Sequence, residues 1–257
     1  MRRFEGTAAL VTGAGRGIGA AVSRRLASEG ARVMMTDADA ARVRRAAADV
    51  AEAESFPCDV ADGASVEAAV ARTVERFGRL DVLVNNAHSC HPDAASFEDQ
   101  TDEHWLRDLD VTLHGAFRCA RAALPHLAAA DGRGAIVSIG SVNGLADFGA
   151  HAYSAAKAGL GSLTRTLAGE AAARGVRVNL VAPGTVATDV WEGREDALER
   201  AAGEYPLGRV GRPDDIAAAV AFLASRDAAW ITGVTLPVDG GLLSGNRGLR
   251  RALSDEA

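Results

Sequence analysis

The chain has 257 residues, of which 48% are hydrophobic and 24% charged, and its formal net charge at pH 7 is -6. This composition is ordinary for a globular protein with a full core, and the negative charge without a long basic run argues against a nucleic-acid partner. No apolar stretch approaches the ~20 residues needed to cross a membrane, and no signal segment precedes the first strand, so we expect a cytoplasmic protein without a membrane partner. Three cysteines at unrelated spacings, Cys58, Cys90 and Cys119, indicate a reducing compartment and no disulfide framework.

Strands and helices are expected to alternate along the chain. The strands are predicted over 7–11, 31–36, 55–58, 80–84, 135–140, 176–181 and 235–238. The helices are predicted from the first glycine-rich turn to about Glu29, and over 64–77, 102–127, 154–173 and 213–225. This alternation, without a linker or a repeat, predicts one Rossmann-like α/β domain over 1–243 with a doubly wound parallel sheet flanked by helices, and a charged tail over 244–257. The region 186–205 has no clear periodicity and is expected to form a mobile flap over the site.

The first predicted strand runs into the turn Thr12-Gly13-Ala14-Gly15-Arg16-Gly17-Ile18-Gly19. A glycine turn between a strand and a helix presents backbone N–H groups and the positive end of the helix dipole to an anion. We therefore expect a dinucleotide phosphate to bind at Gly13, Gly15, Arg16, Gly17, Ile18 and Gly19.

The second predicted strand ends at Asp37. An acidic residue there accepts hydrogen bonds from an adenosine ribose and repels a 2′-phosphate, so NAD is predicted over NADP. Arg16 in the glycine turn favours a phosphorylated cofactor instead, and the alternative role of Asp37 is to cap a following helix. The third strand ends at Asp59 and Val60, which are expected to border the adenine unless Asp59 only caps a loop.

The fourth predicted strand ends at Asn85-Asn86-Ala87, followed by His88-Ser89-Cys90-His91. Asn86 and Ala87 are expected to border the cofactor, although two asparagines at a strand end also suit a turn. The His88–His91 run invites a metal site, but no second ligand cluster lies at metal spacing, so we predict no metal. A loop that lines a substrate pocket is the preferred interpretation.

The fifth predicted strand ends at Ser141, and Tyr153 and Lys157 lie near the start of the next helix. Lys157 is the only lysine in the chain, which suggests a site where a guanidinium cannot replace a compact ammonium. Residues four apart share a helix face, and a charge ~4 Å from a phenol of pKa ~10 lowers that pKa by roughly 3 units at an effective dielectric of ~20. Tyr153 would then titrate near neutrality and serve as a general acid/base. The alternative is an unremarkable surface pair.

Together these motifs resemble the short-chain dehydrogenase/reductase family over about Gly6 to Leu242. The resemblance is carried by the turn 12–19, Asn85-Asn86-Ala87, Ser141 twelve positions before Tyr153, Lys157, Asn179 and Pro183-Gly184. It implies hydride transfer between NAD(H) and a secondary alcohol or ketone. Tyr153 would pass the proton, Lys157 would lower the phenol pKa and bind the nicotinamide ribose, and Ser141 would hold the substrate oxygen. The expected cofactor-binding set also includes Pro183, Gly184, Val186 and Thr188.

The sequence departs from the family pattern at two positions. Thr112 stands where the family commonly has an Asn that completes a proton relay, so we expect that relay to be rerouted or slower. His88 stands where the family usually has glycine, and we predict that it shapes substrate choice with Ser89 and Cys90. Asn143 and Trp191 complete the predicted substrate residues.

Two other functions stay open. One is reduction of 3-oxoacyl thioesters on acyl carrier protein with NADPH, and the other is a non-catalytic, dinucleotide-binding regulatory role. The resemblance also implies a homodimer or homotetramer formed through the fourth and fifth helices, where Ala155, Ala158, Gly159 and Ser162 would allow close helix contact.

Overall fold

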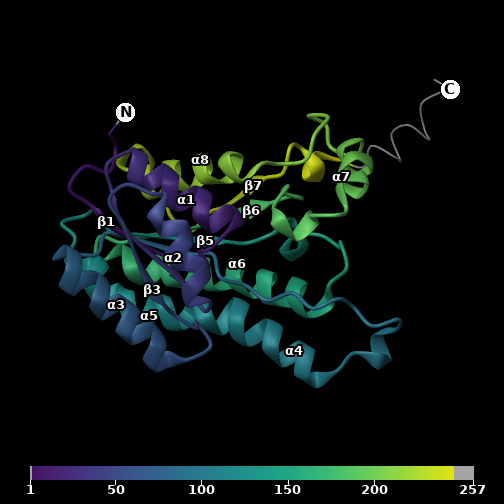
Figure 1. The fold of residues 1–257 in the computed structure, drawn as a ribbon, viewed down its shortest axis with the longest axis horizontal. Helices are drawn as coiled ribbons and strands as arrows, with labels where there is room; N and C mark the ends of the chain where they lie inside the picture. Colours follow the sequence, from purple (N-terminus) through teal and green to yellow (C-terminus); the bar gives the residue numbers. More distant parts are fainter. Residues whose placement is uncertain (1, 246–257) are drawn as a thin grey trace.

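The computed structural model describes residues 2–245, and over that range seven parallel strands form one sheet in the order β3-β2-β1-β4-β5-β6-β7 (Figure 1). The predicted fold class is thereby confirmed. The strands are β1 (Ala8–Val11), β2 (Arg32–Asp37), β3 (Ala53–Pro57), β4 (Val82–Asn85), β5 (Ala135–Ile139), β6 (Arg177–Pro183) and β7 (Thr235–Val238). The strand order reverses between β1 and β4, and a parallel sheet binds its ligands outside the carboxyl ends of strands at such a point.

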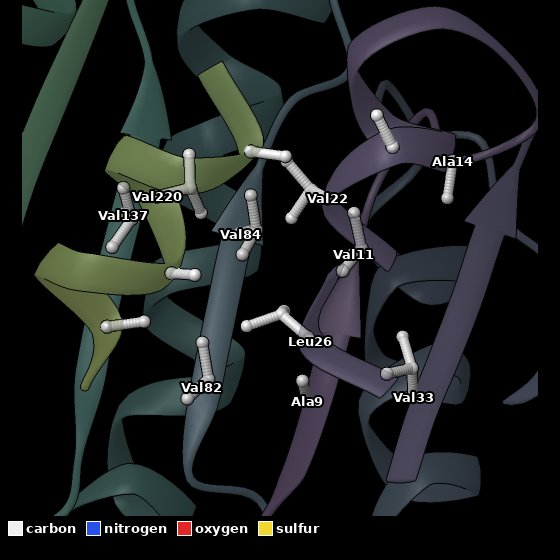
Figure 2. Packing of buried hydrophobic residues seen from close by; sticks show 14 of the residues in the cluster. Ala9, Val11, Ala14, Val22, Leu26, Val33, Val82, Val84, Val137 and Val220 are labelled. Atoms are coloured by element: carbon white, nitrogen blue, oxygen red, sulfur yellow. The ribbon is translucent and has the colours of Figure 1, made fainter. Parts of the chain in front are cut away.

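Helices cover both faces of the sheet (Figure 1). On one face lie α1 (Gly17–Ser28), α2 (Ala40–Ala48) and α8 (Pro213–Ala224), and on the other lie α3 (Gly63–Phe77), α5 (Gly115–Ala128) and α6 (His151–Ala172). Figure 2 shows the first of these layers, in which Val22 and Leu26 of α1 and Val220 of α8 meet the valines of β1, β4 and β5. Each fully buried Val or Leu contributes about 1.5–3 kcal/mol, so this two-sided burial fixes the strand ends that carry the site.

The helix α2 is missing from the sequence prediction. It is rich in Ala and Arg, with only Val43 and Ala47 buried, so its apolar periodicity is weak. Its cap is Asp39, which accepts a hydrogen bond from Arg42 N. The alternative prediction that Asp37 caps this helix is therefore wrong, and Asp37 has other partners.

The long helix predicted over 102–127 is interrupted. It consists of α4 (Asp102–Leu109), a π-helical turn over Asp110–His114, and α5. The turn contains Thr112, which is 1% exposed. Such π turns often lie at functional sites, and this one carries the residue that departs from the family pattern.

The segment after β6 has more structure than predicted. It forms a 3-10 turn at Asp189–Trp191 and the helix α7 (Glu195–Ala202), neither of which was predicted, and the mobility of the flap stays a prediction. Tyr205 ends this segment and accepts a hydrogen bond from Thr185 N at 2.7 Å, which ties the segment back to the end of β6. Within residues 2–245, the helices are all too short or too polar to span a lipid bilayer. Of the predicted tail, only Ser244 and Gly245 fall among the described residues.

Candidate active site

The glycine turn lies against the end of β4 with no room for side chains. A Cβ on Gly19 would lie 2.3 Å from Gly13 O, and one on Gly13 would lie 2.9 Å from Ala87 Cα. Gly13 also has φ +61° and Gly17 φ +54°, a region that favours glycine. Asn86 fixes the turn, because its amide donates to Thr12 O and Gly13 O, both at 2.9 Å. Asn86 therefore has the tying role and borders the predicted cofactor region as well.

The first turn of α1 is open to an anion. In the described chain no side chain caps this helix and no acidic residue lies in its first turn, so its N–H groups face outward. A cavity of about 630 Å³ lies between this turn and the segment after β6, and its lining includes Arg16, Gly17, Thr188 and Trp191. Trp191, predicted to contact substrate, thus lies beside the glycine turn. This backbone cradle fits the pyrophosphate of a dinucleotide.

Asp37 lies at the end of β2 with its carboxylate already bound. Its Oδ2 accepts from Gly15 N at 3.2 Å, and its Oδ1 accepts from Asp39 N at 3.0 Å and from the Arg42 guanidinium at 2.8 Å. The residue is 7% exposed. An adenosine ribose can share these acceptors, but Arg42 brings a positive charge next to the same carboxylate.

Asp59 and Val60 lie just beyond β3. Asp59 accepts a hydrogen bond from Ala61 N at 2.9 Å, as a loop cap does, and its other oxygen lies 4.0 Å from Arg107. Val60 is buried against Gly115, where a Cβ would lie 2.7 Å from Val60 Cγ2. The structure therefore shows the structural role of Asp59, and the adenine contact stays a prediction.

Ser141, Tyr153 and Lys157 come together beyond the carboxyl end of β5. Lys157 Nζ lies 5.2 Å from the centroid of the Tyr153 ring and donates to Ile139 O at 2.5 Å. Ser141 follows β5 and starts a 3-10 turn at Val142–Gly144. A Cβ on Gly144 would lie 2.7 Å from the carbonyl carbon of Lys157, so this turn packs directly on α6.

Burial controls the two titrating groups. It raises the pKa of Tyr153 to about 12, and a hydrogen bond with Ser141 opposes the shift only in part. Burial also lowers the pKa of Lys157 to about 7, because an ammonium that is 3% exposed has lost its water. The expectation that Lys157 brings the phenol pKa near neutrality is therefore wrong for the protein's own groups. The loss of water that disfavours the phenolate of Tyr153 also disfavours the ammonium of Lys157.

Asn143 is occupied in holding the site together. Its Oδ1 accepts from Ser141 Oγ at 3.0 Å, and its amide donates to Gly149 O at 3.2 Å. The start of α6 is held in turn by Asp93, whose carboxylate accepts from Ala150 N at 2.6 Å and His151 N at 3.0 Å. The predicted substrate role of Asn143 thus competes with bonds that position Ser141.

The segment after β4 is clamped to the interrupted helix. The Thr112 hydroxyl accepts from Ser89 N and donates to Ser89 O, both at 3.1 Å. Asp108, 1% exposed, accepts from Ser89 Oγ at 2.7 Å, His91 N at 2.9 Å and the His91 ring at 2.7 Å. Because the only proton of the Thr112 hydroxyl is committed to Ser89, a relay through it would first have to break this clamp.

His88 lies against the phenol ring of Tyr153. Its ring centroid is 6.0 Å from that of Tyr153, in an edge-on arrangement with 64° between the planes. The His88 side chain is partly open to solvent, and desolvation by the surrounding protein together with the neighbouring Lys157 lowers the pKa of its imidazole. Cys90 is exposed, and partial burial of its thiol raises its pKa. His88, one of the residues predicted to select substrate, thus makes an edge-on ring contact with Tyr153.

Known proteins are similar to this chain in sequence and in fold. A family model described as enoyl-(acyl carrier protein) reductase matches residues 13–243. The chain belongs to the short-chain dehydrogenase/reductase family. It is 39% identical to the meso-2,3-butanediol dehydrogenase of Serratia marcescens over 93% of this chain and 95% of that protein. It is 41% identical to the 3-oxoacyl-(acyl-carrier-protein) reductase FabG of Escherichia coli (strain K12), over 93% and 98%. The crystal structure of gox2181 superimposes with a TM-score of 0.89 at 37% identity, covering 95% of this chain and 98% of that one.

This short-chain dehydrogenase/reductase is thus an oxidoreductase of a family that uses nicotinamide dinucleotides. Three of its site residues escaped the sequence reasoning, namely Arg42, Asp93 and Asp108. Asp108 left a signal, since it is an acidic residue within the apolar pattern of a predicted helix. Arg42 and Asp93 left no such signal. Arg42 lies on α2, whose position was not predicted, and Asp93 binds backbone N–H groups that are distant in sequence.

Proposed function

We propose that this protein transfers a hydride between NAD(H) and a secondary alcohol or ketone, with Tyr153 as the general acid/base. The observation that carries the proposal is the convergence of Ser141, Tyr153 and Lys157 beyond the carboxyl end of β5, with Lys157 Nζ 5.2 Å from the phenol ring. The relationship to a butanediol dehydrogenase supports an alcohol or ketone as substrate.

The protein's own groups favour the acid form of the catalyst. With a pKa of about 12, Tyr153 carries its proton at neutral pH and can donate it to the oxygen of a ketone. Ser141 is placed to hold that oxygen, and the buried Lys157, with a pKa of about 7, exchanges protons readily. A bound nicotinamide supplies or accepts the hydride and, when oxidised, adds positive charge. In the oxidative direction Tyr153 would have to act as a base, and the protein alone does not supply the positive charge that would lower its pKa far enough.

The dinucleotide would be held by three parts of the chain. The glycine turn and the open first turn of α1 suit the pyrophosphate, and Asp37 suits the hydroxyls of an adenosine ribose. Lys157 and Tyr153 are proposed to meet the nicotinamide ribose. The buried carboxylate of Asp37 favours NAD over NADP, because it would repel a 2′-phosphate.

A second candidate is reduction of 3-oxoacyl thioesters with NADPH, as the name of the 41% identical FabG suggests. The observation in its favour is Arg42, which donates to Asp37 Oδ1 at 2.8 Å and already neutralises the residue that would exclude a 2′-phosphate. Arg16, within the glycine turn, adds a second positive charge.

One experiment separates these functions. Binding of NADH and NADPH is measured by cofactor fluorescence, followed by turnover of a panel of alcohols, ketones and a 3-oxoacyl thioester. We expect NADH to bind at least about tenfold more tightly, and Asp37→Asn to remove that preference. An Arg42→Ala variant should strengthen the preference for NADH. Preference for NADPH with thioester turnover would favour the second candidate, and binding without turnover of any substrate would favour the regulatory role.

We further propose a homodimer or homotetramer built on α4, α5 and α6. Exposed apolar side chains support it, with Leu106 61% and Phe117 46% exposed. Ala158 and Ser162 are also exposed on α6. Gly159, however, faces its own chain, since a Cβ there would lie 2.8 Å from Leu113 Cδ2. Its predicted place in the subunit contact is wrong, and sedimentation of the purified protein tests the rest.

A further inference from the structure

The imidazole of His88 is held in place from both sides. Its Nδ1 lies 3.3 Å from Asn86 O, and the next residue, Ser89, is bound through its backbone by Thr112 and through its hydroxyl by Asp108. The ring cannot follow a substrate by moving the loop without breaking these bonds. An imidazole fixed beside the Tyr153 ring is therefore preorganised to bind whatever enters the site.

The contact with Asn86 determines which ring nitrogen carries the proton. A backbone carbonyl only accepts hydrogen bonds, so the proton of the neutral ring lies on Nδ1. Nε2 is then a bare acceptor. Within residues 2–245 no hydrogen bond engages Nε2, and desolvation by the surrounding protein and the nearby Lys157 ammonium lower the pKa of the imidazole, which favours the neutral ring. The site therefore contains one unused acceptor next to the catalytic tyrosine.

Two of the other polar side chains predicted to select substrate, Ser89 and Asn143, already have close hydrogen-bond partners. Ser89 Oγ donates to Asp108 at 2.7 Å, and the Asn143 amide bonds Ser141 and Gly149. Trp191 lines the cavity beside the glycine turn. A substrate group that pairs with an unused acceptor must be a donor, since two acceptors repel.

We propose that the substrate carries a hydroxyl on the carbon next to the reacting carbon, and that His88 Nε2 accepts the hydrogen bond of this second hydroxyl. The substrate class is then a vicinal diol and its α-hydroxyketone, with one oxygen at Ser141 and Tyr153 and the other at His88. This inference rests on the proposed alcohol or ketone chemistry and adds the second recognition point. A glycine at this position would offer no such acceptor.

The test compares substrates that differ only in the second hydroxyl. Butane-2,3-diol is paired with butan-2-ol, and cyclohexane-1,2-diol with cyclohexanol, and kcat/KM is measured for each with saturating NAD. The protein should prefer the diol of at least one pair by about tenfold or more, because a site built for a hydroxyl discriminates against its absence. His88→Phe keeps a ring but removes Nε2, and should lower the ratio to about one. His88→Gln places an amide near the position of Nε2 and should restore part of it.

A matched control is His126→Phe, the same substitution in the last turn of α5 at the opposite edge of the sheet, which should keep the ratio. Equal kcat/KM for both members of every pair in the unmodified protein would overturn the inference, and so would a His88→Phe variant that keeps the preference. Failure of the proposed function looks different, since no alcohol or ketone would then be turned over although NADH binds.

Discussion

Positively charged side chains have different roles at the two edges of the sheet. At the amino edge the helices end, and their last carbonyls carry partial negative charge. Arginines bind them there: Arg177 donates to Leu223 O at 2.6 Å, Ala224 O at 3.1 Å and Ser225 O at 3.0 Å, and Arg32 donates to Phe77 O at 2.7 Å. A planar guanidinium with five donors suits several fixed acceptors at once.

At the carboxyl edge of the sheet, by contrast, hydrogen-bond donors of the described residues remain available to a ligand. The N-terminus of α1 has no side-chain cap among the described residues, and the one lysine of the chain makes a single bond, to Ile139 O. Arginine satisfies acceptors and stabilises the fold, whereas a buried ammonium with a pKa of about 7 remains available for proton exchange. The comparison also shows that cavity size is a poor guide to function. A cavity of about 740 Å³ lies at the amino edge, beside Arg177, which binds the end of α8.

The strongest test of this division is the removal of the phenol oxygen. Tyr153→Phe should lower kcat by about 10²–10⁴-fold, the usual contribution of a general acid/base, without lowering the thermal midpoint. The matched control is Tyr205→Phe at the only other tyrosine, which loses one hydrogen bond to Thr185 N and should cost about 1 kcal/mol of stability. A Tyr205→Phe variant as inactive as Tyr153→Phe would contradict the assignment.

Lys157→Met should change how stability depends on pH. The lysine pKa is about 7 in the folded protein and 10.5 ordinarily, so between these values the unfolded chain binds more protons and stability rises with pH. The destabilising effect of Lys157 is fully present below pH 7 and vanishes near pH 10.5. Urea unfolding from pH 6 to pH 10 should find the Met variant more stable by a few kcal/mol at the acid end, with this difference reduced to under about 1 kcal/mol at the alkaline end. A constant difference between the two proteins would show that Lys157 does not titrate there.

The amino edge should respond in stability and hardly in rate. Arg177→Met leaves three carbonyls of the α8 terminus without their donor, which costs about 2–3 kcal/mol of unfolding free energy. We expect kcat/KM to change by less than about threefold, since the site lies at the other edge. Arg226→Met is the control, because Arg226 is exposed in the same cavity and should cost under about 0.5 kcal/mol. A large loss of activity in Arg177→Met at full stability would break the comparison.

The smallest effect is expected at the clamp on the carboxyl edge. Thr112→Val removes both hydrogen bonds to Ser89 and should cost about 1 kcal/mol. It should also lower the diol preference part-way, because the His88 segment loosens. Thr166→Val removes a hydroxyl that bonds only its own helix, and should leave the preference intact. An unchanged preference in Thr112→Val would show that the clamp does not position His88.

The fold could be predicted well from the sequence because apolar runs and glycine turns are local signals. It could not give α2, whose Ala and Arg pattern buries only two side chains, nor the π turn, since one extra residue per turn barely disturbs the apolar spacing. The proximity of Tyr153 and Lys157 followed from helical periodicity. Their pKa values did not, because spacing reveals a neighbouring charge but not the burial that removes it.

The contacts that position His88 could not be predicted from local sequence patterns either. Its departure from glycine was visible, yet the clamp by Asp108 and Thr112 joins segments about 20 residues apart through side chains. Which nitrogen of the ring is free depends on a single backbone carbonyl, Asn86 O. These contacts between distant segments can be read only from the three-dimensional structure.

The central claim is that Tyr153 moves the proton while a bound nicotinamide exchanges a hydride with the substrate carbon. An alcohol deuterated at its reacting carbon is incubated with NAD and either the unmodified protein or Tyr153→Phe, and mass spectrometry follows deuterium into the reduced nicotinamide. We predict transfer by the unmodified protein and at least about a hundredfold slower transfer by the variant, with NADH still bound. Equal rates of deuterium transfer in the two proteins would contradict the account.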